Sequence, residues 1–361
     1  MSWAGALCPM HLQETVPGIT TLLFQTSHRI AATADCPGNA PTHSSAERVG
    51  GRQYLRRVDN ARFPNGDGKR DARLSNHPEL LHSRQRVVDP HCMMAYFIFR
   101  SGDGTLHGVT LVPSCVGKDV PNQNLTSYLV NESVAIDAGS IGLLPDMEAQ
   151  ARIRHVFLSH SHMDHIASLP AFLENVYKGT SDCVRIHCTR EVEEVLRQDI
   201  FNDRVWPDFV GLSQIIPPFL KFERLESGRS VFVEGLSVTP VSVNHTVDTV
   251  AFVIEDATSA VAIVTDTGPT EAIWEKVNET RNMSAIFLDV AFPNEMQELA
   301  CVAKHLTPAM FRDEIAKVKL KPKIFVVHMK PSFSDELVAE LMALGVPEVE
   351  ICTPNVTYEF P

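Results

Sequence analysis

The chain has 361 residues, of which 44% are apolar and 21% charged, as in a soluble globular protein. Its formal net charge of −12 disfavours a long nucleic acid as partner, because such binding depends on clustered Lys and Arg. A small anion needs only a local positive centre, so this class of ligand is not excluded.

Three features are absent from the sequence, and each absence disfavours a class of protein. No apolar run approaches the ~18 residues of a membrane span, and the amino terminus lacks the basic and apolar regions of a secretory signal. The eight cysteines form no CxxC pair, which is typical of reduced, buried thiols. We therefore expect a cytoplasmic protein with no membrane partner.

Residues 1–92 differ from the rest of the chain. They hold 11 Lys and Arg against 8 Asp and Glu, so this segment is +3 and the remainder −15. Residues 36–78 are rich in Pro, Gly, Asn, Asp and Arg without a period of 2 or 3.6, which is typical of disorder. The alternative is that the true start is Met93 or Met94. Either way, the prediction is an N-terminal extension over 1–92 and one folded domain over 93–361.

The first half of the predicted domain contains mostly strands. Apolar alternation predicts a hairpin over 126–140 that turns at Asn131 and Glu132. Thr189 is a candidate N-cap for a helix over 189–201, and another helix is expected near 170–178. The other strands are expected at 108–114, 154–159, 184–188, 221–226, 230–234, 236–243, 250–255 and 260–266.

The second half adds helices to the strands. We expect helices that start at Pro269, at Thr307 and at Ser334, the last ending near Gly345. Strands are expected at 285–290, 323–328, 349–352 and 357–360. Runs of strands with helices outside them, twice over, predict two sheets packed face to face and covered by helices.

A cluster of metal-ligand side chains follows the buried strand at 154–159. The sequence LSHSHMDHIASLP places His160, His162, Asp164 and His165 within six positions. On a loop that leaves a strand, residues 160 and 162 can point the same way while 164 and 165 turn the next corner. One loop can thus serve two metal positions about 3.5–4 Å apart. Imidazole and carboxylate suit zinc, and also manganese or iron. A hydrogen-bonded polar loop is the alternative.

Further candidate ligands stand at the ends of later strands. His245, Asp266 and His328 are each a lone polar residue that follows an apolar strand, where a loop can aim it at a site. Each alone is as consistent with an ordinary polar loop as with a ligand. Together with the upstream cluster they indicate a closed metal site.

HSHMDH with these later residues resembles the metallo-β-lactamase fold, over roughly residues 106–361. The resemblance implies an α/β protein, an αββα four-layer sandwich, with two divalent metal ions at one edge. Zn²⁺ is the first choice, with Mn²⁺ or Fe²⁺ as alternatives. The implied ligands are His160, His162 and His245 for one ion and Asp164, His165 and His328 for the other, with Asp266 as the bridge.

Other segments resemble one branch of that family. LDVAFPNEM and AKHLTPAMFRDEIA resemble segments of its phosphodiesterases, which include class II 3′,5′-cyclic-nucleotide phosphodiesterases and tRNA 3′-processing endonucleases. NLTSYLVNESVAIDAGS, LPAFLENVY and FNDRVWPDF resemble the cyclic-nucleotide group. Met163 stands where Leu is usual, and Asp289 stands where the endonucleases have Glu. These departures leave the exact substrate open.

The resemblance implies hydrolysis of cyclic AMP or cyclic GMP to the 5′-monophosphate. His305 is the candidate proton donor to the leaving oxygen, oriented by Asp289, and Asp164 is a candidate proton acceptor as well as a ligand. Asp137 is expected to orient a histidine ligand. Lys330 is a candidate contact for a phosphate oxygen, or else a solvated surface lysine.

The expected partner is therefore a small-molecule cyclic nucleotide, and a homodimer is a possible assembly. A tRNA 3′-end nuclease is the main alternative, and the charge of −15 outside residues 1–92 disfavours it. A non-catalytic binding protein of the same fold would be expected to lack a ligand, yet all seven ligand positions are filled. A carboxylic ester or thioester hydrolase is a further alternative, which the His305 segment disfavours.

Overall fold

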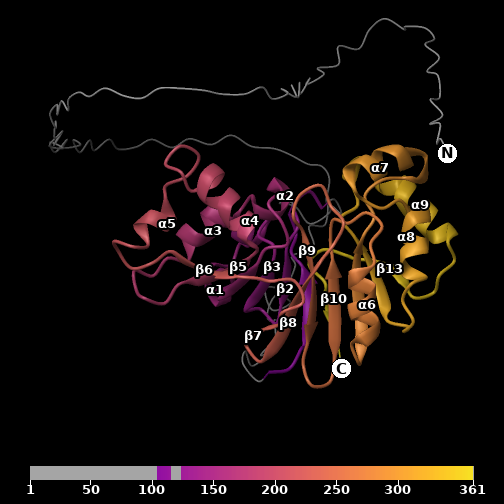
Figure 1. The fold of residues 1–361 in the computed structure, drawn as a ribbon, viewed down its shortest axis with the longest axis horizontal. Helices are drawn as coiled ribbons and strands as arrows, with labels where there is room; N and C mark the ends of the chain where they lie inside the picture. The colour runs from indigo at the N-terminus through magenta and orange to yellow at the C-terminus, as the bar shows by residue number, and fades with distance from the viewer. Residues whose placement is uncertain (1–103, 115–122, 361) are drawn as a thin grey trace, which may run out of the picture. The chain divides into compact units, whose positions relative to one another are not determined.

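The computed structural model describes residues 104–114 and 123–360. The expected extension over 1–92 and its boundary at residue 93 lie outside these residues. Within them, two seven-stranded sheets are present (Figure 1). No helix of the described segments is long and apolar enough to cross a membrane.

The first sheet holds the strands of the first half and the last strand of the chain. Its order is β14-β1-β2-β3-β4-β5-β6, antiparallel from β14 to β3 and parallel from β3 to β6. The strands are β1 (Gly108–Leu111), β2 (Tyr128–Val130), β3 (Val134–Ile136), β4 (His155–Phe157), β5 (Val184–Cys188), β6 (Leu220–Arg224) and β14 (Thr357–Glu359).

The second sheet has the order β13-β12-β11-β10-β9-β8-β7. It is parallel from β13 to β10 and antiparallel from β10 to β7, so that β8 and β10 run in the same direction. The strands are β7 (Val231–Val233), β8 (Leu236–Ser242), β9 (Val250–Glu255), β10 (Ala260–Val264), β11 (Met283–Asp289), β12 (Lys323–Val327) and β13 (Val349–Ile351).

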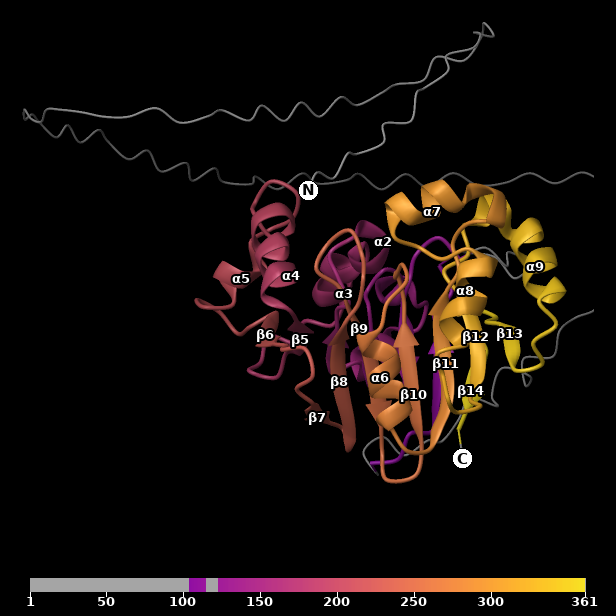
Figure 2. The ribbon, with the colours of Figure 1, turned by 45° about the vertical axis from the view of Figure 1, so that its right-hand side comes forward.

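The helices lie outside the two sheets. Those beside the first sheet are α1 (Met147–Arg152), α2 (Met163–Ile166), α3 (Leu169–Asn175), α4 (Arg190–Val195), which continues as a π-helical turn over Leu196–Ile200, and α5 (Phe209–Leu212). Those beside the second are α6 (Ala272–Glu279), α7 (Gln297–Ala303), α8 (Pro308–Ile315) and α9 (Ser334–Ala343). Figure 2 shows α6, α8 and α9 on the outer face of the second sheet.

Three separate cores hold the layers together. Between the sheets, Phe157 meets Phe252 edge-on and Tyr128 meets Phe287 in the same way, each with ring centroids 5.8 Å apart. A second core joins the first sheet to its helices, and a third, around Trp274, joins the second sheet to α6, α8 and α9. Burial of these apolar side chains, aliphatic and aromatic, favours the layered arrangement. The predicted αββα sandwich is therefore confirmed.

Most predicted elements are present, with shifted ends. The hairpin turns as expected, because Asn131 and Glu132 both adopt left-handed φ values of 51° and 65°. The side chain of Thr189 accepts a hydrogen bond from the Val192 N–H, so it is the N-cap of α4. The helix expected from Pro269 begins three residues later, and α7 was not expected at all.

Candidate metal centre

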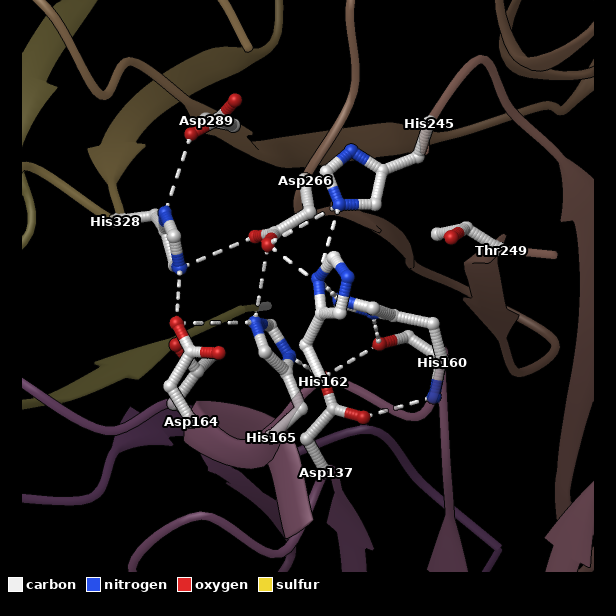
Figure 3. Close-up of polar contacts among 12 residues, drawn as sticks. Asp137, His160, His162, Asp164, His165, His245, Thr249, Asp266, Asp289 and His328 are labelled. Carbon is white, nitrogen blue, oxygen red and sulfur yellow. Dashed lines mark hydrogen bonds and ion pairs between the residues drawn. The ribbon is translucent and has the colours of Figure 1, made fainter. Parts of the chain in front are cut away.

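The candidate residues lie at one edge of the sandwich, where strands of both sheets end. His160 follows β4, His245 follows β8, Asp266 follows β10 and His328 follows β12. These strands point the same way within each sheet, so their carboxyl ends meet at one edge. Figure 3 shows these side chains turned toward a common centre. The segment between β4 and α3 supplies the other three candidate ligands, His162 from the loop and Asp164 and His165 from α2.

Three imidazoles form the first group. His162 Nδ1 lies 3.0 Å from His160 Nε2 and 3.2 Å from His245 Nε2. The other ring nitrogens are already engaged, since His245 Nδ1 donates to the Lys304 carbonyl (3.1 Å) and His160 Nδ1 lies 2.9 Å from the Ser159 hydroxyl. Nitrogens ligating one tetrahedral zinc at 2.0–2.1 Å stand about 3.3 Å apart. The group therefore has the spacing that one cation requires.

A carboxylate and two imidazoles form the second group. His328 Nε2 lies 3.2 Å from Asp164 Oδ2, and His165 Nε2 lies 3.9 Å from the same oxygen. Asp266 stands between the two groups. Its Oδ2 is 3.2 Å from His165 Nε2 and 3.5 Å from His160 Nε2, while its Oδ1 is 3.2 Å from His328 Nε2 (Figure 3). One carboxylate thus faces both groups.

Two buried atoms support the fit to cations. His165 Nε2 and Asp266 Oδ1 are buried without a hydrogen-bond partner in the structure. Buried polar atoms are seldom left unpaired, because their desolvation costs about 1–3 kcal/mol each. A divalent cation would satisfy both. The four donor atoms of each group lie within 4.8 Å of one another, and Asp266 belongs to both groups. The described residues can therefore hold two divalent ions.

The backbone is strained at the same place. Asp137, Asp266 and His328 have φ values of 61°, 50° and 60°, in the left-handed region that disfavours residues with a Cβ. Such conformations cluster at functional sites, where the surroundings hold them. The turns after β3, β10 and β12 thereby direct side chains to the edge of the sandwich.

Asp137 holds the histidine loop in place through three hydrogen bonds. Its buried carboxylate accepts hydrogen bonds from the Ser159 N–H (2.7 Å), from the Ser159 hydroxyl (2.8 Å) and from His165 Nδ1 (2.7 Å). The bond to His165 places the proton on Nδ1, so that Nε2 presents its lone pair to the centre. The expected orienting role of Asp137 matches this geometry.

Gly139 allows the loop to approach this closely. A Cβ at this position would lie 2.0 Å from the Asp164 carbonyl oxygen and 2.7 Å from the Thr126 N–H. The Thr126 N–H donates to that same carbonyl oxygen (2.8 Å), and the Ala138 N–H donates to the His165 carbonyl (2.7 Å). Two backbone hydrogen bonds therefore hold α2 against the turn after β3.

Asp289 and His305 stand beside His328. Asp289 is fully buried at the end of β11, and its Oδ2 lies 3.0 Å from His305 Nδ1. Its Oδ1 lies 3.4 Å from His328 Nδ1, without hydrogen-bond geometry. The His305 ring stacks on His328, with centroids 5.3 Å apart. Sequence analysis expected the contact with His305 but not the contact with His328.

The two groups differ in their protonation without a cation. Burial lowers the pKa of His160 to about 4, and it also lowers the pKa of His162 and His245. Burial would lower the pKa of His328 too, but the carboxylates of Asp266 and Asp164 outweigh it and raise that pKa to about 9.

His165 and Asp266 follow the same electrostatics. Burial opposes the charged form of His165, yet the Asp266 and Asp137 carboxylates raise its pKa well above the usual value. Burial likewise would raise the pKa of Asp266, but His165 and His328 hold it well below its usual range. Without metal, the second group is therefore an ion-pair cluster, whereas the first consists of neutral imidazoles.

The chain is similar to known proteins in both sequence and fold. A family model described as the β-lactamase superfamily domain matches residues 138–329, more than half of the chain. The chain belongs to this superfamily. The matched range contains all nine predicted metal-binding and catalytic residues, which the structure brings together at one edge: His160, His162, Asp164, His165, His245, Asp266, Asp289, His305 and His328.

Individual relatives are distant. A probable 3′,5′-cyclic-nucleotide phosphodiesterase of Yersinia pestis is 24% identical over 266 residues, which are 59% of this chain and 76% of that protein. Unliganded yeast PDE1 covers 71% of this chain and 99% of its own, with 15% identity and a TM-score of 0.57. The short form of human tRNase Z covers 70% and 99%, with 14% identity and a TM-score of 0.52. These two structures share the fold.

The sequence did not indicate Lys304 as a residue of this centre. It lies between α7 and His305, has a φ of 53°, and contacts His245 through both its carbonyl and its ammonium group. Its neighbour His305 was the only signal in the sequence, because a contact across 59 positions leaves no local pattern.

Proposed function

We propose that the protein is a metal-dependent phosphodiesterase that hydrolyses 3′,5′-cyclic nucleotides to 5′-monophosphates. The observation that carries the proposal is one carboxylate, Asp266, shared between two cation-sized groups, with the His305–Asp289 pair beside them. Metal-dependent hydrolysis follows from the superfamily. The name of the Yersinia pestis relative supports the choice of substrate class.

The proposed ligands follow the two groups. His160, His162 and His245 would hold one ion, and Asp164, His165 and His328 would hold the other, with Asp266 contacting both. Imidazole and carboxylate donors suit Zn²⁺ first, and also Mn²⁺ or Fe²⁺. When bound, two such ions lower the pKa of a water toward neutrality and neutralise charge on phosphate oxygens.

His305 is proposed as the general acid. Its Nδ1 faces Asp289, so Nε2 is the nitrogen that can exchange a proton with substrate. In the reaction, a water oxygen bonds to phosphorus, the bond from phosphorus to the 3′ oxygen breaks, and His305 gives its proton to that oxygen. Asp289 orients the His305 ring through this contact with Nδ1, as a buried carboxylate does for a neighbouring imidazole.

Asp164 and Lys330 are partly exposed charged groups beside the second group. Asp164 is partly exposed; burial would raise its pKa, but the hydrogen bond from His328 and the charges of His165 and His328 together lower that pKa below the usual range. We propose that it accepts a proton from the attacking water. Lys330 Nζ lies 3.8 Å from Asp164 Oδ2, so its charge can reach a phosphate oxygen placed above the two groups.

A tRNA 3′-processing nuclease is the second candidate, because the short form of human tRNase Z has the same fold. RNA recognition requires a basic face or arm. Residues 93–361 carry a net charge of −15, and the Yersinia pestis relative is named for cyclic nucleotides. Both observations favour the smaller substrate.

The test is a phosphodiester panel assayed with the purified full chain. It contains cyclic AMP, cyclic GMP and a tRNA precursor, each with Zn²⁺ or Mn²⁺ and each repeated with excess chelator. The proposal expects chelator-sensitive release of a 5′-mononucleotide. Cleavage of the precursor alone would select the nuclease instead. Metal-loaded protein that acts on none of the three would refute both.

A further inference from the structure

Lys304 has an unfavourable backbone conformation. It is the C-cap of α7, with φ 53° and ψ 53°, in the left-handed region. Helices commonly end in this way, but the position usually holds Gly because a Cβ destabilises it. The lysine therefore stands there against a local energetic preference, and such strain points to a role for the side chain.

The contacts of Lys304 converge on one residue. Its carbonyl oxygen accepts a hydrogen bond from His245 Nδ1 (3.1 Å), and its ammonium group donates to the His245 carbonyl oxygen (2.7 Å). The first bond sets the tautomer of His245, so that Nε2 faces His162 and Asp266. The second bond holds the backbone of His245. Lys304 thus fixes both the ring and the main chain of one residue.

His305, the next residue in the chain, also lies against His245. The His305 N–H donates to the Ala300 carbonyl (2.9 Å), and the His305 ring meets the His245 ring with centroids 5.1 Å apart. On the other side, the Gly268 N–H donates to the Asn244 carbonyl (2.8 Å). The loop that carries His245 is therefore held between the turn after β10 and Lys304.

We propose that Lys304 is a positioning residue. It locks His245 in its cation-binding orientation and couples that orientation to the place of His305. This inference rests on the proposed role of His245 as a metal ligand. Partners that orient a ligand in this way typically change metal affinity by 10–100-fold when they are removed.

Two substitutions separate the charge from the strain. Lys304→Met removes the ammonium group and keeps the unfavourable φ, whereas Lys304→Gly removes both. Both variants keep the carbonyl bond to His245. Asn282→Gly is the matched control, because Asn282 is exposed, has a φ of 57° and lies outside the metal centre. Lys304→Arg tests whether a second long cation restores the contact.

The measurements use the full chain and do not depend on turnover. Co²⁺ is titrated into metal-free protein, the visible absorption is recorded, and affinity is obtained by competition with a chelator. We expect both Lys304→Met and Lys304→Gly to weaken the binding of one Co²⁺ equivalent by 10–100-fold and to alter its absorption. We also expect Lys304→Gly to melt no lower than the wild type in the metal-free form.

Four outcomes separate the failure of this inference from the failure of the proposed function. Weakened Co²⁺ binding in both variants, with unchanged binding in Asn282→Gly and partial recovery in Lys304→Arg, supports it. Binding within twofold of the wild type in both Lys304 variants overturns it. A wild-type chain that binds Co²⁺ but hydrolyses no cyclic nucleotide refutes the proposed substrate and leaves the role of Lys304 testable. A wild-type chain that binds no cation overturns both.

Discussion

Metal uptake should release protons unequally from the two groups. At pH 7 the first group is already neutral, because burial lowers the pKa of His160 to about 4 and also lowers the pKa of His162 and His245. The second group contains His328, whose pKa is raised to about 9, and His165, whose pKa is raised well above the usual value. A cation binds only the neutral imidazole, so it must displace these protons.

The size of the effect follows from the pKa of His328. The pKa of His328 lies about two units above a working pH of 7, so the ring is about 99% protonated. Removing that proton costs about 2.7 kcal/mol, or 100-fold in metal affinity. Because the pKa is raised, the penalty is largest at low pH and disappears as pH rises through about 9. The second Zn²⁺ should therefore bind about tenfold more tightly for each unit between pH 6.5 and 8.5, for each proton displaced.

Isothermal titration of metal-free protein with Zn²⁺ measures both the number of protons released and the pH dependence of the affinity. Titrations in two buffers of different ionisation enthalpy give the number of protons released, and repetition at several pH values gives the slope. We expect uptake of the two equivalents together to release at least one proton and binding to tighten as pH rises. Uptake of both equivalents without proton release, or affinities independent of pH, would show that the carboxylates do not hold His165 and His328 protonated.

Three substitutions test separate parts of the site. His305→Ala should lower kcat by about 10²–10⁴-fold and leave bound metal, measured by elemental analysis, unchanged; loss of metal would make His305 a ligand. Lys330→Gln should raise KM for the cyclic nucleotide about 10-fold or more, as expected for a lost charge-assisted contact, while Lys323→Gln on the remote end of β12 should not; equal KM values would exclude the phosphate contact. Gly139→Ala should lower the free energy of unfolding by about 1–3 kcal/mol or more and weaken metal binding, whereas Gly268→Ala, whose Cβ would meet its nearest neighbours at 3.4 Å, should be tolerated; a normal melting temperature for Gly139→Ala would contradict the close approach.

The sequence predicted the fold class and the convergence of the seven candidate ligands, whose binding of metal stays a prediction. His160, His162, Asp164 and His165 are close in sequence, and His245, Asp266 and His328 each follow an apolar strand. Patterns of this kind are local and can be read directly from the order of the residues. The resemblance to a known family then supplied the pairing of the two ligand sets, which local patterns cannot give.

Contacts between residues far apart in the chain were harder to predict from the sequence. The left-handed turns at Asp266 and His328 come from tertiary contacts, and neither residue is a glycine that would have indicated them. The contact of Asp289 with His328 depends on the parallel register of β11 and β12. The helix expected at Pro269 begins instead at Ala272 because residues 268–271 hold other contacts, including the Thr270 N–H to the Glu314 carboxylate.

The position of β14 has a consequence for biosynthesis. Its strand pairs with β1, so Gly108 lies opposite Glu359 across some 250 positions of chain. The first sheet carries Asp137 and the histidine loop, yet its outer edge stays open until residue 359 has been translated and has left the ribosome. Contacts of such long separation form slowly and leave strand edges exposed in the meantime. A nascent chain stalled shortly before β14 should therefore be a good substrate for chaperones and a poor acceptor of metal.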